Sequence, residues 1–314
     1  MKIEYLSASR LNTYMDCSFR YFLQYHLDLP ELKGQTIATH KGSAVHEALE
    51  LYVKGEKDYT QLLKNYYIEH KVWEFDNRSE KRGFPHPVQK KCDTCKWAAK
   101  SGDSYICSIA GQEISNFDGC PKPNFEDDLK LLDTTITKPD SCLNNKIIGA
   151  EVAFRNEYEG FKVRGFMDLV LEIDEETLEV RDYKTGNYTK NTDEAFRDLQ
   201  MRIYSMVAKE LFPQYKYVLM TLDYLRKGPI SVIFSKEDDD NTRKFLKEAY
   251  AKIAGAKEPT RRKSFKCSWC IGYDECSKIR ETFLDANGNF VMPPASEEKD
   301  YSPKKGKPLP KAGG

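Results

Sequence analysis

The sequence predicts an α/β fold in which a central mixed sheet lies between helices. Three patterns favour it: helical spacing of apolar residues near the N-terminus, strand-like apolar runs grouped about two turns between 147 and 234, and amphipathic segments after each group. The chain has 314 residues, 40% of them hydrophobic and 12% aromatic, which is enough for a sizeable core. This length suits one large domain or two modest ones.

Two helices are expected before the first strands. In residues 7–28 apolar side chains recur at helical spacing, and Ser7 or Ser9 can cap the first turn. Residues 42–54 form the second helix, which leaves His46 and Glu50 one turn apart beside the buried stripe. That stripe consists of Ala44, Val45, Ala48, Leu49 and Tyr52.

Strands are expected from residue 147 onward. Residues 147–184 contain two runs that flank an acidic turn at Asp174–Thr177, which indicates an antiparallel hairpin. A second hairpin is predicted about residues 226–229, and a helix over 240–254 follows it. Between the hairpins, residues 193–211 form an amphipathic helix. Its predicted buried side comprises Phe196, Leu199, Ile203, Val207 and Leu211.

Residues 86–122 have little apolar periodicity, so we interpret them as a cysteine-rich insertion held by metal. Four cysteines fall there, and their spacing suits a structural zinc site, although a second iron–sulfur cluster or unliganded thiols stay open. The candidate ligands are Cys92, Cys95, Cys107 and Cys120. Cys142 is interpreted as a free thiol.

The charge and hydropathy of the sequence argue against some classes of protein. Lys+Arg and Asp+Glu both number 49, which counts against a broad duplex-binding face that acts through bulk electrostatics. No run of about 18 apolar residues predicts a membrane span, and the N-terminus lacks the apolar region of a secretory signal. We therefore expect a cytoplasmic protein that does not bind membranes; a prokaryotic or phage origin is a separate expectation that rests on the motifs below.

The candidate catalytic residues are Asp168, Asp182 and Lys184. Asp182 and Lys184 are two residues apart, so on a strand both face the same side. Asp168 interrupts an apolar run on the preceding strand, where an unpaired carboxylate is costly unless a cation neutralises it. Two carboxylates and the carbonyl of Tyr183 are oxygen ligands that suit Mg²⁺ or Mn²⁺. By itself, the DYK tripeptide is more often an exposed strand with a charge pair.

Six motifs that occur in order along the chain favour the catalytic interpretation of DYK. SASRLNTYMDCSFRY, GSAVHEALE, GFMD, DYKTG, QMRIY and CSWCIGYDEC resemble the RecB-like nucleases of the PD-(D/E)XK superfamily, in particular the branch with an iron–sulfur cluster. That branch includes CRISPR-associated and helicase–nuclease members. The resemblance covers about residues 5–55 and 150–280 and implies a restriction-endonuclease-like core with phosphodiester hydrolysis in DNA.

The resemblance implies roles for individual residues. His46 matches a metal-binding histidine, Asp168 the first metal carboxylate, and Asp182 and Lys184 the acidic residue and lysine that name the superfamily. The resemblance therefore implies a Mg²⁺ or Mn²⁺ site formed by His46, Asp168, Asp182 and the carbonyl of Tyr183. Gln200 and Tyr204, one turn apart, match a helix motif that contacts DNA. Glu151 matches a further acidic position seen in some members.

Three clustered cysteines, Cys267, Cys270 and Cys276, supply three thiolates, whereas a [4Fe–4S] cluster needs four. The resemblance implies that Cys17 is the fourth ligand. A zinc ion held by the same four thiolates is the alternative. Ser18 follows Cys17 where many relatives have proline, so the local turn differs.

The expected segments are a helical part over 1–85, the insertion over 86–125, the catalytic core with the cluster loop over 126–280, and a disordered tail over 293–314. We expect a metal-dependent deoxyribonuclease, an exonuclease on single strands or DNA ends, that serves replication, repair, recombination or CRISPR adaptation. The alternatives are a non-catalytic iron–sulfur nucleic-acid-binding protein, or the nuclease subunit of a larger complex. The sequence has no GxxxxGK[ST] loop, so a helicase would be a separate partner, as would a CRISPR integrase.

Overall fold

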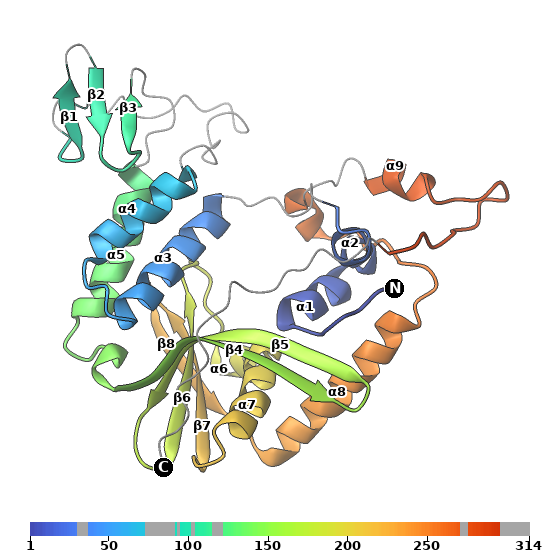
Figure 1. The fold of residues 1–314 in the computed structure, drawn as a ribbon. Helices are drawn as coiled ribbons and strands as arrows, with labels where there is room; N and C mark the ends of the chain where they lie inside the picture. Colours follow the sequence, from blue (N-terminus) through green and yellow to red (C-terminus); the bar gives the residue numbers. More distant parts are fainter. Residues whose placement is uncertain are drawn as a thin grey trace. The chain divides into compact units, whose positions relative to one another are not determined.

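A computed structural model describes residues 1–29, 37–72, 92, 95–101, 104–114, 122–270 and 276–295 (Figure 1). The chain divides into two compact units. One consists of residues 1–3, 13–33 and 252–314, and the other of residues 4–12 and 34–251. The helices and strands that carry the predicted catalytic residues all belong to the second unit, the nuclease unit below.

The nuclease unit is organised about a five-stranded sheet in the order β4-β5-β6-β7-β8. β6 and β7 are parallel and the other neighbours are antiparallel, so the sheet is mixed, as predicted. The loop between β5 and β6 holds the predicted acidic turn, and a short turn joins β7 to β8. The strands are β4 (Lys146–Tyr158), β5 (Phe161–Glu172), β6 (Thr177–Lys184), β7 (Tyr217–Tyr224) and β8 (Gly228–Ile233).

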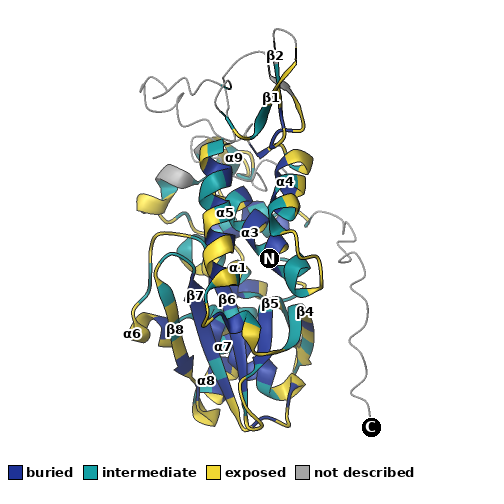
Figure 2. Cartoon of the chain, turned by 90° about the vertical axis from the view of Figure 1, so that its left-hand side faces the viewer, coloured by how far each residue is buried: buried dark blue, intermediate teal, exposed yellow. Residues whose placement is uncertain are grey.

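Helices cover the two faces of this sheet, whose central strands are the most buried part of the unit (Figure 2). On one side α3 (Ile37–Val53) packs with α4 (Tyr59–Glu69) and α5 (Lys122–Thr137). On the other side α7 (Leu199–Leu211) packs against β6 and β7. The sequence predicted α3, with a start five residues too late, but neither α4 nor α5. The predicted stripe of α3 is buried except for Tyr52, which is half-buried.

The predicted helix over 7–28 is three shorter elements. α1 (Ala8–Asp16) ends before Cys17, which is extended with φ −162° and ψ 107° and precedes α2 (Ser18–Tyr21) and the π-helical turn η1 (Phe22–His26). The break changes the direction of the chain at a predicted cluster ligand. No proline or glycine marks it in the sequence, so apolar spacing alone predicted one continuous helix.

The predicted helix over 193–211 is also divided. α6 (Thr192–Phe196) ends, and Asp198 then caps α7 by accepting a hydrogen bond from the backbone of Met201 at 3.0 Å. Ile203 and Val207 are fully buried as predicted, whereas Phe196 and Leu211 are 36% and 39% exposed. The cap places Gln200 in the first turn of α7, whose N-terminus faces the end of β6.

The described part of the predicted insertion forms a small sheet that packs against neighbouring helices, and metal binding there stays a prediction. β1 (Ala98–Ser101), β2 (Ser104–Cys107) and β3 (Gln112–Ile114) form a three-stranded antiparallel sheet. Cys107 and Ile109 are buried with Phe125 in the hydrophobic cluster of α3, α4 and α5. Hydrophobic packing therefore organises part of this segment.

The remaining elements follow the second hairpin. α8 (Lys236–Ala254) begins four residues before the predicted helix, and it leads to the 3-10 turn η6 (Phe265–Trp269) and to α9 (Cys276–Glu281). Most of the tail predicted to be disordered lies outside the described residues. A search of the described helices finds none with the length and apolarity that crossing a bilayer requires.

Candidate active site

The carboxylate of Asp168 lies where β5 and β6 separate. Its Oδ2 accepts a hydrogen bond from the backbone N–H of Tyr183 at 2.8 Å, so β6 fixes its position. His46, on α3, approaches the same oxygen with Nδ1 at 3.3 Å. The other ring nitrogen of His46 donates to the carbonyl of Tyr183 at 2.9 Å. The structure thus brings together His46, Asp168 and the Tyr183 carbonyl from three separate elements.

Glu151 on β4 joins this group. Its backbone has φ +49°, a conformation that β-strand residues rarely adopt, and it follows a register shift between Ile147 and Gly149. One ligand atom each from His46, Glu151 and Asp168 lies within 4.8 Å of the others. The distorted strand therefore directs a third potential metal ligand into the site at the cost of backbone strain.

Asp182 and Lys184 form a second group beside the first. The Lys184 ammonium pairs with Asp182 Oδ2, and Gln200 Nε2 donates to Asp182 Oδ1 at 2.6 Å. Gln200 also donates to the Tyr204 hydroxyl at 3.1 Å and accepts from Lys184 at 3.3 Å. All the matched residues of β6 and α7 are thus connected. Asp182 itself does not join the three-residue group of potential ligands.

Burial and mutual repulsion set the charges of these groups. Burial, together with the charges of Asp168 and Glu50, raises the pKa of Glu151 to about 7. Burial also raises the pKa of Asp182, and Lys184 opposes that shift. Burial would lower the pKa of Lys184, but the adjacent Asp182 carboxylate raises it, so the ammonium stays charged at neutral pH.

Comparison with known proteins identifies the family of this chain. The model of the PD-(D/E)XK nuclease superfamily matches residues 5–276, most of the chain. The chain belongs to the PD-(D/E)XK nuclease superfamily. A solved structure from Eubacterium rectale, described as a "putative exonuclease", is similar at 12% identity with a TM-score of 0.48, over 84% of this chain and 86% of that chain. No curated protein matches.

PD-(D/E)XK nucleases use divalent metals, and the donors here fit such an ion. Two carboxylates and an imidazole converge, and Glu151 and Asp168 repel one another unless a proton or a cation lies between them. Oxygen donors suit Mg²⁺ and Mn²⁺, and the imidazole favours the softer Mn²⁺. Among the described residues, the group of potential ligands includes Glu151, and Asp182 lies outside it; the predicted set of His46, Asp168, Asp182 and the Tyr183 carbonyl stays a prediction.

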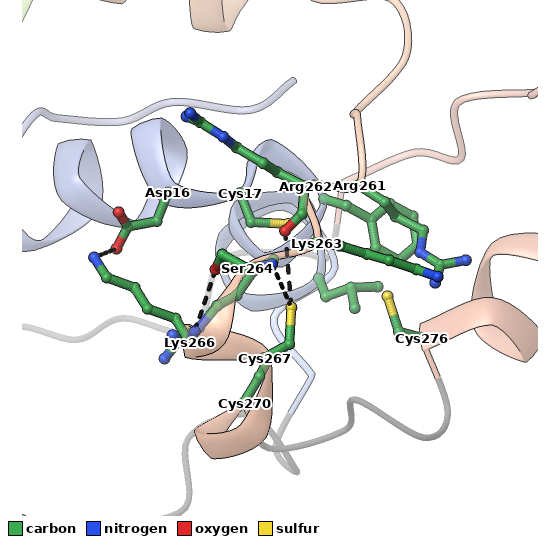
Figure 3. A pocket seen from close by; sticks show the side chains of 13 residues that line it. Asp16, Cys17, Arg261, Arg262, Lys263, Ser264, Lys266, Cys267, Cys270 and Cys276 are labelled. Atoms are coloured by element: carbon green, nitrogen blue, oxygen red, sulfur yellow. Dashed lines mark hydrogen bonds and ion pairs between the residues drawn. The ribbon is translucent and has the colours of Figure 1, made fainter.

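The four predicted cluster cysteines lie in the other unit and line one cavity (Figure 3). The sulfur atoms of Cys17, Cys267 and Cys276 face a common space in that view, and Cys270 lines it as well. The same cavity is lined by five basic side chains and by one acidic one, Asp16. The basic residues are Arg20, Arg261, Arg262, Lys263 and Lys266.

The predicted zinc ligands are less closely gathered. Cys95 donates its backbone N–H to the Cys92 carbonyl at 3.0 Å. Cys107 is buried, and Cys120 lies outside the described residues. Among the residues whose placement is described, the ligand atoms of Cys92, Cys95 and Cys107 do not all lie within 4.8 Å of one another. Zinc at this position stays a prediction.

Proposed function

We propose that the protein is a Mg²⁺- or Mn²⁺-dependent deoxyribonuclease that removes nucleotides from single strands or DNA ends. The observation that carries the proposal is the convergence of His46, Glu151 and Asp168 beside the Asp182–Lys184 pair. Such a site presents a cation-binding group and a fixed ammonium side by side. A phosphodiester has the matching chemistry, because it offers anionic oxygens to both.

When bound, the divalent cation supplies Lewis-acid stabilisation of the phosphate and lowers the pKa of water. The protein's own groups orient the reactants. Lys184 is charged, so it acts as a cation toward the phosphate rather than as a base. Gln200 holds Asp182 and Lys184 in register by donating to one and accepting from the other. His46 is fixed by the Tyr183 carbonyl, which orients its other nitrogen toward Asp168.

Cleavage of end-labelled single- and double-stranded DNA in Mn²⁺ or Mg²⁺ tests the proposal and reveals polarity. Asp168→Asn and Lys184→Ala should each lower the rate at least about 100-fold, the scale for losing one transition-state contact. Thermal unfolding provides the control for folding. Near wild-type cleavage in either variant would contradict the assignment. Activity without ATP would show that the chain acts without a helicase partner; dependence on a helicase or CRISPR integrase would favour the subunit alternative.

We further propose that the protein belongs to the RecB-like, iron–sulfur branch of the superfamily. Support comes from the cavity that Cys17, Cys267, Cys270 and Cys276 line together with an excess of basic side chains. Burial raises the pKa of the Cys270 and Cys276 thiols, and the nearby Arg20 and Arg261 oppose that shift in favour of the thiolate form that a bound metal needs. The basic side chains also offset the negative charge of a four-thiolate cluster. The cluster would tie residue 17 to residues 267–276 and so stabilise its unit.

Anaerobic purification tests the cluster. Four iron atoms per chain and broad visible absorbance are expected, and Cys17→Ser should lower both, while Cys142→Ser should leave them unchanged. A colourless protein with one zinc at this site would contradict the cluster. Zinc at the insertion is proposed separately, on spacing alone, and Cys92→Ser should remove one zinc without loss of iron.

A further inference from the structure

The hairpin of β4 and β5 has one buried face and one open face beyond the catalytic residues. Val152 and Phe154 on β4 are each 5% exposed, and Val163 and Met167 on β5 are fully buried. The alternate positions are open: Phe166 is 39% exposed. Ala153 and Arg155 are exposed and Arg164 is half-buried. Strand alternation therefore places one aromatic and two basic side chains on a single face.

This open face leads away from the candidate metal site. Asp168, Phe166 and Arg164 occupy alternate positions of β5, and Arg155 pairs with Arg164 across the strands. At the rise of a strand, Phe166 lies about 7 Å and Arg164 about 13 Å along β5 from Asp168. The longer distance corresponds to a few nucleotides of a DNA strand.

The pairing of Arg155 with Arg164 is unfavourable for folding. Like charges directly opposite one another on antiparallel strands are destabilising. Among the residues that the structure describes, neither arginine forms an ion pair, whereas Arg181 and Arg243 pair with carboxylates at 2.6 and 2.7 Å. Two adjacent cations without a protein anion form a binding site for an anion from outside.

The N-terminal segment fixes one of these arginines. Leu6 forms a parallel bridge with Val163, so residues 5–7 run beside β5. This places the ring of Tyr5 under the guanidinium of Arg164 at 4.0 Å, and the guanidinium of Arg10 lies over the same ring at 3.8 Å. Cation–π contact orients the arginine without neutralising it.

We propose that this face, termed the strand track and formed by Arg155, Arg164 and Phe166, binds a single DNA strand that runs into the catalytic site. The arginines contact backbone phosphates and Phe166 stacks on an unpaired base, which a paired base in a duplex does not offer. The track rests on the proposed nuclease function and adds the surface that would hold its substrate, a single strand or an end that frays over a few nucleotides.

Binding measured without divalent cation tests the track apart from catalysis. Fluorescence anisotropy of a labelled single-stranded oligonucleotide in EDTA gives the affinity and its dependence on salt. Arg155→Gln with Arg164→Gln should lower the slope of log K against log salt by about 1.4 and the affinity about 25-fold at 0.1 M salt. Phe166→Ala should weaken binding about 5- to 150-fold.

Matched controls lie on α8, outside the track and the catalytic site. Phe245 is 39% exposed, the same as Phe166, so Phe245→Ala controls for loss of an exposed aromatic ring. Lys236→Gln with Lys244→Gln removes two exposed charges elsewhere. Both controls should bind like the wild type. Arg155→Glu provides a second test, because it replaces the repulsion of Arg164 by an ion pair: the melting temperature should rise while the affinity falls.

The results of these measurements distinguish a failure of the strand-track proposal from a failure of the proposed nuclease function. Unchanged affinity and salt slope in the arginine and Phe166 variants, with wild-type cleavage of DNA in Mn²⁺, would overturn the track alone. Equal losses for blunt duplex and single strand would overturn the assignment to single strands. A wild-type protein that cleaves no DNA in Mn²⁺ or Mg²⁺ would overturn the proposed function instead.

Discussion

Replacing Glu151 by Gln should stabilise the metal-free protein at neutral and alkaline pH. Burial raises the pKa of Glu151 to about 7 in the fold, with Asp168 and Glu50 contributing, from an ordinary value of 4.5. Between these two values the folded protein binds more protons than the unfolded chain, so stability falls as the pH rises. The loss is absent below about pH 4.5 and complete above about pH 7.

The size of this effect follows from the shift. From 4.5 to about 7 is 2.5 pH units, which at about 1.36 kcal/mol per unit gives about 3.4 kcal/mol. Glu151 is only half-buried, so solvent screening lowers the figure to about 2 kcal/mol. A change of this size is a large fraction of the stability of a domain and lies within the reach of denaturant titration.

Urea unfolding in EDTA at several values from pH 5 to pH 8 measures the destabilisation that the ionised Glu151 causes. The wild type should lose about 2 kcal/mol more than Glu151→Gln across this range. Glu157→Gln is the control, since Glu157 is exposed on the same strand and its pairing with Lys162 at 3.9 Å is weak. Parallel curves for the wild type and Glu151→Gln would refute the reasoning, because they would show that Glu151 is ionised at no cost.

Two further predictions concern the same unit. Mn²⁺ affinity, measured by calorimetry, should fall about tenfold per unit below pH 7 as Glu151 takes up its proton. Glu151→Gln should bind Mn²⁺ more weakly than the wild type at pH 7 and above, and the difference should shrink as the pH falls. An unchanged affinity down to pH 5.5 would exclude Glu151 as a ligand. Arg226→Gln should lower the free energy of unfolding by about 1–3 kcal/mol, because Arg226 makes two hydrogen bonds to Asp127 at 2.8 and 2.7 Å. Denaturant titration measures this loss. If the variant is as stable as the wild type, solvent screens the pair of Arg226 and Asp127.

Strand residues were the most predictable part of the molecule. The alternation of side chains about Asp168 and Asp182 predicted β5 and β6, and the two turns predicted the β5–β6 and β7–β8 hairpins. Neither β4 as a separate strand nor the parallel pairing of β6 with β7 was predicted. Glu151 is different, since only the family resemblance indicated it. Its position in the site depends on a backbone with φ +49°. Apolar periodicity carries no signal for such a distortion, because the residues on either side keep their strand-like pattern.

The prediction of helices failed where polar groups are buried, or where a helix cap interrupts the stripe of apolar residues. Asp128 is fully buried in α5 and accepts a hydrogen bond from the Tyr67 hydroxyl of α4 at 2.7 Å. A charged residue in the buried stripe conceals the helical period of α5. At Asp198 the cap of α7 lies inside an apolar pattern that continues across it, so one helix was predicted where two form.

The β4–β5 hairpin carries like-charged neighbours at two points, and their signs are opposite. At the first point the carboxylates of Glu151 and Asp168 lie close together. At the second point the guanidinium groups of Arg155 and Arg164 lie opposite one another across the strands. Exchanging one residue of each pair would create two favourable pairs without altering the net charge of zero. The free energy that the fold gives up is recovered only when something from outside neutralises both points. A divalent cation at the carboxylates and a phosphate at the arginines do so together, and a DNA strand with its metal ion presents both on one backbone. The same arrangement that weakens the empty hairpin thus favours the complex over the free protein.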